Sequence, residues 1–428
     1  MRHLSVRVAV LAAAAATLSW SAFNTVSAQT RSSGELQTPG QADAFVDSIG
    51  ADSKFSYRGS PYVRLFPTIS KMLIDSGIRH LRDSAPPTPD YLERMATLGS
   101  HGIRHSAGFT VKAKPGHITS ILTTFAPYVD FVESQNEYDS QRKNNPNWIS
   151  ELIAAQKTLY TTVHGNPAFN GITVLGPALS HQQLYAALGP LDQYEDAGNL
   201  HYSPCDYHPG VNIVGHEGMR RMHRLLRTST VTRPIWTTEA GYNDMSRVCR
   251  VPDDVIAKYD PRTSALRWNL GEPRTYYYQL VDLLSDPTFG NMGLIFADGS
   301  PKPQFTALAS LIHVLNDPGR PFTPTPLHYA MSGDTQNVDH TLLQKRDGWY
   351  ELLLWLEVPS WKSLDNHRSG VPIDVQPQTV SISLPTSITS ATIYRYASDW
   401  NLTSAPLPVK NQSAQVKVTD AISVIELK

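Results

Sequence analysis

The chain has 428 residues, and its 37 Lys and Arg against 38 Asp and Glu give a formal net charge of −1. A nearly neutral chain without a basic stripe lacks the charge that nucleic-acid binding requires, so we exclude that class of partner. Two cysteines are too few for a disulfide scaffold. About 400 residues exceed one ordinary hydrophobic core, so we expect a large domain and a smaller one.

Residues 1–28 have the pattern of a secretory signal peptide. A positively charged start precedes an apolar run over 8–18, and Val26-Ser27-Ala28 offers the small residues that signal peptidase reads. The run is too short to span a bilayer, and no later stretch is long and apolar enough to do so. An uncleaved membrane anchor is the alternative. We expect cleavage near Ala28, a secreted or periplasmic protein with no membrane attachment, and a polar lead over 29–45.

Strand-like runs alternate with helical stretches over residues 46–318. The eight candidate strands are 46–52, 77–83, 102–109, 128–137, 171–178, 198–204, 233–242 and 290–299. Strands separated by helices pair in parallel through crossovers. Eight such units match an α/β fold, the (β/α)8 or TIM barrel, in number and size. A doubly wound open sheet is the alternative, but it rarely needs eight equal units, and no Gly-x-Gly-x-x-Gly fingerprint is present.

The sequence changes character after Pro318. Residues 339–358 read as two strands joined through Asp347-Gly348, which is a hairpin signal. Four more segments with apolar and polar residues in alternation follow: "QTVSISLP", "SATIYRYA", "AQVKVTD" and "ISVIEL". We predict a small antiparallel β-sandwich over residues 319–428.

Polar side chains stand at most of the predicted strand ends, where (β/α)8 barrels place their active sites. They are Arg82 and Asp83 on the second strand, His105 on the third, Asn136 and Glu137 on the fourth, His201 and Tyr202 on the sixth, Glu239 on the seventh and Asp298 on the eighth. Glu137 and Glu239 would face each other across the barrel mouth. Two carboxyl groups flanking one bond are what glycoside cleavage requires.

These segments resemble a clan A glycoside hydrolase, with families 39 and 5 the nearest. The motifs that carry the resemblance are "GIRHLRD" (77–83), "ESQNE" (133–137), "LHYSP" (200–204), "PIWTTEAGY" (234–242) and "GLIFADGSPKPQFTAL" (293–308). The C-terminal sandwich is similar to the accessory domain that often follows such barrels. Two features depart from the pattern: Tyr138 follows Asn-Glu where Pro is common, and the first strand ends in "GADSKF" without the usual His or Asn.

The resemblance implies roles for individual residues. Glu137 would be the general acid/base and Glu239 the nucleophile. Arg82, Asn136, His201 and Tyr202 would support them and contact the substrate.

Other residues are open to two interpretations. His105, Tyr242 and Trp268 are further candidates for binding sugar, although aromatic residues more often belong to the core. Glu133 is interpreted as structural. Lys54 is interpreted as a solvated loop lysine, with recognition of an acidic sugar as the alternative.

Cys205 and Cys249 follow neighbouring strands, so a disulfide between them is geometrically plausible. Two free buried thiols are the alternative.

The predicted function is a secreted retaining glycoside hydrolase that acts on a polysaccharide or oligosaccharide. A transglycosylase with the same residues, or a carbohydrate-binding protein without activity, are the alternatives. No metal or organic cofactor is expected, because His-Glu-x-x-His is absent and the proposed mechanism needs neither. Gly-x-Ser-x-Gly is absent too, which argues against a serine hydrolase. The sugar, the linkage and the oligomeric state are left open.

Overall fold

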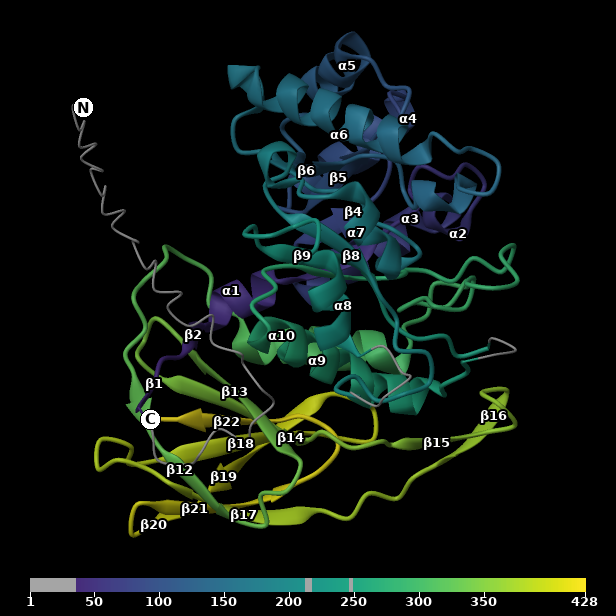
Figure 1. Ribbon diagram of the computed structural model, residues 1–428. Coiled ribbons are helices and arrows are strands. Elements are labelled where there is room, and N and C mark those ends of the chain that lie inside the picture. Colours follow the sequence, from purple (N-terminus) through teal and green to yellow (C-terminus); the bar gives the residue numbers. More distant parts are fainter. Residues whose placement is uncertain (1–35, 212–217, 246–248) are drawn as a thin grey trace, which may run out of the picture.

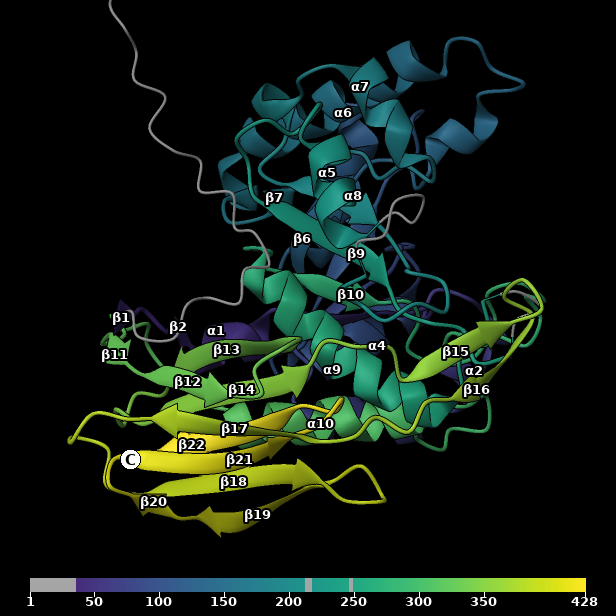
Figure 2. The same ribbon diagram turned by 60° about the horizontal axis from the view of Figure 1, so that its bottom comes forward.

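The computed structural model describes residues 36–211, 218–245 and 249–428, so the predicted signal peptide lies outside the described residues. Figure 1 shows two bodies: a barrel surrounded by helices, and a sandwich of C-terminal strands beside it. Helices α9 (Asp253–Asn269) and α10 (Pro303–Leu315) lie between the two, as both views show (Figures 1 and 2). Within the described ranges, no helix has the length and apolarity needed to cross a bilayer.

Eight parallel strands form the barrel, as predicted. They are β3 (Ile49–Asp52), β4 (His80–Arg82), β5 (Arg104–Gly108), β6 (Val129–Glu133), β7 (Thr173–Val174), β8 (Gly198–His201), β9 (Ile235–Ala240) and β10 (Thr275–Tyr277). The order in the sheet is β7-β6-β5-β4-β3-β10-β9-β8. A parallel bridge between Leu175 and Ala197 joins its two ends. The sheet therefore closes on itself, and all strands point their C-terminal ends to one face.

Helices surround these strands on the outside. They are α2 (Pro61–Arg64), α3 (Phe66–Ser76), α4 (Pro89–Gly99), α5 (Pro115–Phe125), α6 (Trp148–His164), α7 (Tyr185–Leu188) and α8 (Met219–Leu226), together with α9 and α10. Proline in the first turn begins α3, α4, α5 and α10, where its missing N–H costs no hydrogen bond. Gly77 ends α3 in the left-handed conformation (φ 77°).

The eighth strand is not the one predicted. The sequence indicated a strand over 290–299 and a helix over 262–285, but α9 ends at Asn269 and Thr275–Tyr277 form β10. The β-branched and aromatic residues of β10 are fully buried between β3 and β9. Ile295 makes only isolated bridges, to Val281 and Pro301. Asp298 consequently lies outside the barrel sheet, where its carboxylate accepts a hydrogen bond from Ser300.

The C-terminal strands form an antiparallel sandwich, as predicted. One sheet has the order β12-β17-β21-β20, and the other β19-β18-β22-β14-β13-β2. Their bounds are β12 (Ala330–Gly333), β13 (Val338–Gln344), β14 (Tyr350–Leu356), β17 (Gln378–Ser383), β18 (Ala391–Tyr396), β19 (Leu402–Leu407), β20 (Val409–Lys410), β21 (Ser413–Val418) and β22 (Ser423–Leu427). Apolar side chains such as Leu352 and Val416 fill the space between the sheets.

The described part of the polar lead contributes to this C-terminal body. β1 (Leu36–Gln37) pairs with β11 (Leu327–His328), and β2 (Gly40–Gln41) pairs with β13. Helix α1 (Ala42–Asp47) then leads directly into the first barrel strand. The chain therefore runs through the sandwich before it enters the barrel.

Candidate active site

A cavity of about 1210 Å³ opens at the C-terminal ends of the barrel strands. Its lining includes Lys54, Tyr57, Arg82, Asp83, Glu133, Asn136, Glu137, His201, Tyr202, Tyr207, Glu239, Tyr242, Tyr278, Asp286 and Phe289. Every barrel strand except β7 contributes to the cavity wall a residue at its C-terminal end or a few positions beyond it. The cavity has room for more than one sugar ring, since ligand pockets of drug-sized molecules span about 300–1,000 Å³.

The two glutamates singled out by the sequence meet in this cavity. Glu239 belongs to β9, and Glu137 follows β6 in the left-handed backbone conformation (φ 45°), which is rare for a residue other than glycine. His201 lies between them: its Nδ1 is 3.0 Å from Glu137 Oε1 and 3.6 Å from Glu239 Oε2. A carboxylate oxygen of Glu137 lies within 4.8 Å of one of Glu239. One bond of a ligand can therefore lie between the two carboxyl groups.

Arg82 connects Glu239 to the opposite side of the barrel. Its Nη1 donates to Glu239 Oε1 (2.6 Å), its Nε to Glu133 Oε1 (2.6 Å), and its Nη2 to Asn136 Oδ1 (2.7 Å). Burial would raise the pKa of Glu239, but the charges of His201 and Arg82 outweigh burial and hold that pKa below its ordinary value. Glu239 is therefore kept ionised.

His201 has a defined tautomer. The Thr238 hydroxyl donates to Asn199 Oδ1 (2.6 Å), so its oxygen accepts from the Nε2–H of His201 at 3.0 Å. Nδ1 then carries a hydrogen only when the ring is charged. Burial lowers the pKa of His201, yet Glu239's charge and the hydrogen bond to Glu137 raise it above its ordinary value. Glu137 and His201 can thus hold one proton between Oε1 and Nδ1.

Two carboxylates beside Arg82 are not among the site residues predicted from the sequence. Glu133, interpreted as structural, lines the cavity and binds both Arg82 and Asn199. Asp52, at the end of β3, is completely buried with both oxygens 3.4 Å from Arg82 Nη1, and burial raises its pKa to about 7. The signal was available for both: an acidic residue in an otherwise apolar parallel strand requires a buried partner.

The other predicted site residues divide into two groups. Arg82, Asn136, His201, Tyr202 and Tyr242 line the cavity together with the two glutamates. Tyr242 is nearly buried and donates its hydroxyl hydrogen to the Tyr207 carbonyl (3.0 Å), so only part of the ring forms cavity wall.

His105 and Trp268 do not belong to the site. The ring of His105 is buried against Tyr91 and Phe125 in the helix layer, and burial lowers its pKa to about 4. Trp268 lies on α9 and packs against Phe45, away from the cavity. Sequence position on a strand or helix does not tell which way a side chain points, and both point into the core.

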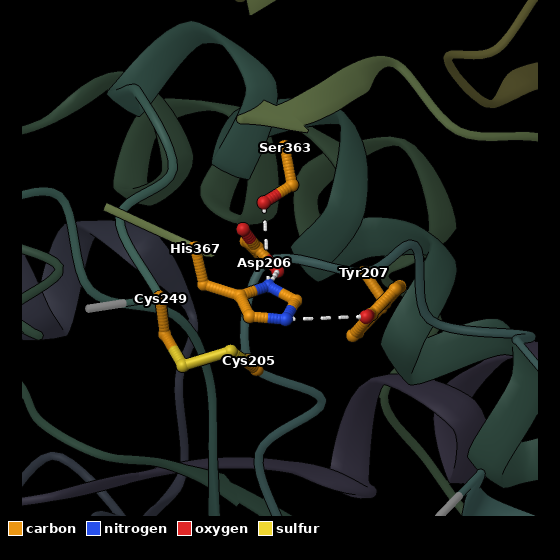
Figure 3. Close-up of a disulfide and its surroundings, with 6 residues drawn as sticks. All are labelled: Cys205, Asp206, Tyr207, Cys249, Ser363 and His367. Atoms are coloured by element: carbon orange, nitrogen blue, oxygen red, sulfur yellow. Dashed lines mark hydrogen bonds and ion pairs between the residues drawn. A yellow bond between two sulfur atoms is a disulfide. The ribbon is translucent and has the colours of Figure 1, made fainter. Parts of the chain in front are cut away.

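The structure contains the Cys205–Cys249 disulfide, which joins two positions 44 apart in the sequence (Figure 3). It joins the segments that follow β8 and β9, and both cysteines line the cavity. The hairpin of β15 (Trp361–Leu364) and β16 (Ser369–Pro372) reaches this point from the sandwich. His367 at its tip lies 2.8 Å from Asp206 Oδ1 and accepts the Cys249 N–H at its carbonyl (2.8 Å).

In the part of the chain that the structure describes, two groups of side chains could be considered as metal ligands. Glu137, His201 and Glu239 have donor atoms within 4.8 Å of one another, but Arg82 already donates to Glu239, so a bound cation would be repelled by the guanidinium. Cys205 belongs to a second group with Asp206 and His367, but its sulfur is engaged in the disulfide. The first group is therefore better suited to proton transfer than to metal binding.

No family model matches the chain, and no curated protein matches its sequence. Solved structures match its fold: a family 39 glycoside hydrolase from Bacteroides cellulosilyticus WH2 (TM-score 0.55, 15% identity, 91% of this chain and 83% of that one) and a glucosidase from Croceicoccus marinus (0.62, 10%, 92% and 97%). A GH51 arabinofuranosidase from Xanthomonas axonopodis pv. citri is a third (0.57, 12%, 92% and 99%). The chain therefore shares the barrel-and-sandwich fold of these solved glycoside hydrolases.

Proposed function

We propose that the protein is a retaining glycoside hydrolase in which Glu137 is the general acid/base and Glu239 the nucleophile. The observation that carries this proposal is the spacing of the two carboxyl groups, whose nearer oxygens lie within 4.8 Å. Retaining enzymes hold their carboxyl groups about 5–5.5 Å apart, whereas inverting enzymes need about 6.5–9.5 Å to admit a water molecule. The fold shared with glycoside hydrolases supports the same conclusion.

In the first step, the ionised Glu239 attacks the anomeric carbon while Glu137 gives its proton to the leaving oxygen. The C–O bond to the leaving group breaks, and an ester between the sugar and Glu239 forms. Arg82 holds Glu239 in place and in its ionised state through the 2.6 Å hydrogen bond. Asn136 is fixed by Arg82 in turn, which leaves its amide N–H groups to donate to a sugar hydroxyl.

In the second step, Glu137 takes a proton from water, whose oxygen attacks the anomeric carbon and releases Glu239. His201 assists the change of role. Before the first step Glu137 carries the shared proton and donates a hydrogen bond to the neutral Nδ1 of His201. That proton goes to the leaving oxygen, and the proton that Glu137 takes from water in the second step restores the starting state. Glu137 can therefore act as acid and base without moving away from the reacting oxygen.

The experiment is a glycan screen of the wild type beside single substitutions at the two glutamates. The panel contains aryl glucosides, xylosides and arabinofuranosides as well as polysaccharides. Glu239→Gln removes the nucleophile, and we expect turnover to be abolished. Glu137→Gln removes the acid/base, and we expect a loss of about 10²–10⁴-fold. Glu93→Gln, on the exposed face of α4, is the matched control.

Azide separates the two roles. A small anion replaces the base in an alanine variant of Glu137, so a glycosyl azide of retained configuration is expected. In an alanine variant of Glu239, azide attacks in place of the nucleophile, so the product has the inverted configuration. Wild-type turnover by Glu239→Gln would contradict the proposal.

A transglycosylase using the same residues is the second candidate, favoured by the exposed aromatic rings of Tyr57 (53%) and Phe289 (54%) at the cavity rim. Such rings stack on sugar faces and could hold an acceptor. Product analysis at high acceptor concentration distinguishes the two, because a transglycosylase forms longer products in place of the free sugar. A protein that binds carbohydrate without activity would show binding and no turnover in the same screen.

We also propose export after cleavage near Ala28. The support is the Cys205–Cys249 disulfide, since disulfides persist in oxidising compartments. Mass spectrometry of protein recovered from the periplasm or the medium should give an N-terminus near Gln29, whereas a full-length cytoplasmic product would contradict export.

A further inference from the structure

Lys54 is a cation of the cavity wall that has no ion-pair or hydrogen-bond partner for its ammonium group among the described residues. It lies two residues beyond β3, and its ammonium group is 5.0 Å from the ring centre of Tyr278 and 5.9 Å from that of Tyr57. All three residues line the cavity. Among the described residues, no carboxylate lies within ion-pair distance of Lys54, and no acceptor lies within hydrogen-bonding distance of its Nζ. Three N–H donors are therefore available to a ligand.

The nearby carboxylates are already engaged by other groups. Asp83 accepts hydrogen bonds from the hydroxyls of Ser53 (3.1 Å) and Ser56 (2.6 Å). Glu239 is bound by Arg82 at 2.6 Å. Lys54 acts on these anions only from a distance, as a favourable charge. Its ammonium group is held by two aromatic rings, which attract a cation but do not satisfy its N–H donors.

The position of Lys54 assigns it to one side of the reacting bond. β3 is hydrogen-bonded to β10, and β10 to β9, which carries Glu239. Lys54 and Tyr278 thus stand on the nucleophile's side of the barrel, whereas Glu137 follows β6 on the other. In a double displacement the sugar attacked by the nucleophile lies on this side, and the leaving group lies beside the acid. A group that meets Lys54 belongs to the attacked sugar.

We propose that Lys54 binds an anionic substituent of the attacked sugar, a carboxylate or a sulfate ester, so that the substrate is an acidic glycan. The inference rests on the glycoside hydrolase function proposed above. A carboxylate or sulfate oxygen accepts charge-assisted hydrogen bonds from the ammonium group, which are stronger than those to a neutral hydroxyl. Without Lys54, the same substituent would face the negative charges of Glu239 and Asp83 and be repelled.

A purely structural role for Lys54 predicts a different effect of its removal on neutral and anionic substrates. If the lysine served only to offset the buried carboxylates around Arg82, its removal would change the state of Glu239 for every substrate. Neutral and anionic sugars would then lose activity by the same factor. If Lys54 instead recognises an anion, its removal lowers activity selectively on the charged substrate, and chiefly by raising KM.

The experiment compares matched aryl glycosides: the glucoside, the glucuronide and the glucoside sulfated at its primary hydroxyl, with the galacto series alongside. Wild type, Lys54→Gln and Lys54→Met are assayed beside Lys71→Gln, which removes a surface lysine outside the cavity. We expect wild type to prefer a charged member. Both Lys54 variants should lower kcat/KM for that member by about 10- to 100-fold and leave the neutral member within about threefold.

The two charged substrates distinguish the two anions. An enzyme whose Lys54 binds a carboxylate prefers the uronide, and one whose Lys54 binds a sulfate ester prefers the sulfated sugar. Equal losses on charged and neutral substrates, or wild-type turnover of neutral members alone, overturn the assignment of Lys54 and leave the glycosidase intact. Absence of turnover on every aryl glycoside and polysaccharide contradicts the proposed function, and the inference with it. Unchanged melting temperatures of the variants exclude misfolding as the cause of a loss.

Discussion

Arg82 donates a hydrogen bond to Glu239 at 2.6 Å, and the same guanidinium binds Glu133 and Asn136 with its other nitrogens. One buried cation from β4 thus fixes residues from β9, β6 and the segment after β6. The proposed nucleophile is ionised and oriented before any substrate binds, and this preorganisation is what a double displacement requires of it.

Arg82→Lys should therefore impair the enzyme more than its conserved charge suggests. A lysine is a single point donor and cannot bind three acceptors in the plane of a guanidinium. We expect kcat/KM to fall about 10- to 100-fold, as for loss of charge-assisted hydrogen bonds. The hydrogen bond from Arg82 lowers the pKa of Glu239 in addition to its charge, so loss of that bond should move the acid limb of the kcat/KM profile to higher pH. Arg79→Lys, whose side chain binds Asp43 instead, is the control; an unmoved acid limb would argue against this role.

Asp52 should make stability depend on pH. Burial raises its pKa from 3.8 to about 7, so the folded protein binds this proton more tightly than the unfolded chain. The stabilisation from this proton is full below about pH 4 and is lost as the pH rises to about 7. Asp52→Asn should therefore gain stability relative to wild type between about pH 5 and pH 8 in urea denaturation. The exposed Asp334→Asn serves as control, and a constant difference across this range would refute the prediction.

The Cys205–Cys249 disulfide should contribute to stability. Its sequence separation of 44 corresponds to at most about 4 kcal/mol of unfolding free energy in the chain-entropy model. The double variant Cys205→Ser/Cys249→Ser should lose up to that amount. Wild type measured with reductant should fall to the same value, while the double variant should not respond to reductant. A reductant effect of equal size on the double variant would mean that the loss has another origin.

The β15–β16 hairpin should influence substrate binding although it lies in the C-terminal part of the chain, as a two-stranded sheet of its own. Asp365, Asn366 and His367 at its tip all have positive φ (48°, 55° and 70°), an unfavourable backbone that the contacts to Asp206 and Cys249 help to hold. We expect His367→Ala to raise KM about 2- to 12-fold, as for loss of a hydrogen bond, with little change in kcat. Lys362→Ala, exposed on the same hairpin, is the control. A fall in kcat at constant KM would contradict a positioning role.

Much of the site could be predicted because parallel strands bring distant residues to one face. Glu137 and Glu239 are 102 positions apart (239 minus 137), yet both follow or end barrel strands and so meet at the barrel mouth. The same reasoning places Arg82 and His201 beside them. Strand ends are visible in sequence as short apolar runs that stop at a polar residue. This signal holds for β4, β6, β8 and β9, which supply these four side chains.

The positions of the other residues depend on strand register and on tertiary contacts, which the hydrophobic pattern of the sequence does not contain. The register of β5 shifts between His105 and Ser106, so strict alternation does not apply, and His105 faces Tyr91 and Phe125. β10 has only three residues, too few for a periodic signal, and follows a helix that is buried on most sides. Lys54 looked like a solvated lysine because its environment is made by Tyr57 and Tyr278, which the sequence alone does not bring together.

The most direct measurement is to trap the covalent intermediate. An activated aryl glycoside of the preferred sugar, fluorinated next to the anomeric carbon, forms the ester quickly and hydrolyses it slowly. Peptide mapping by mass spectrometry should locate the sugar on Glu239, and proton NMR of the first product from the ordinary substrate should show the retained anomer. A label on another carboxylate, or a first product with inverted configuration, would contradict the assignment of Glu239 as nucleophile.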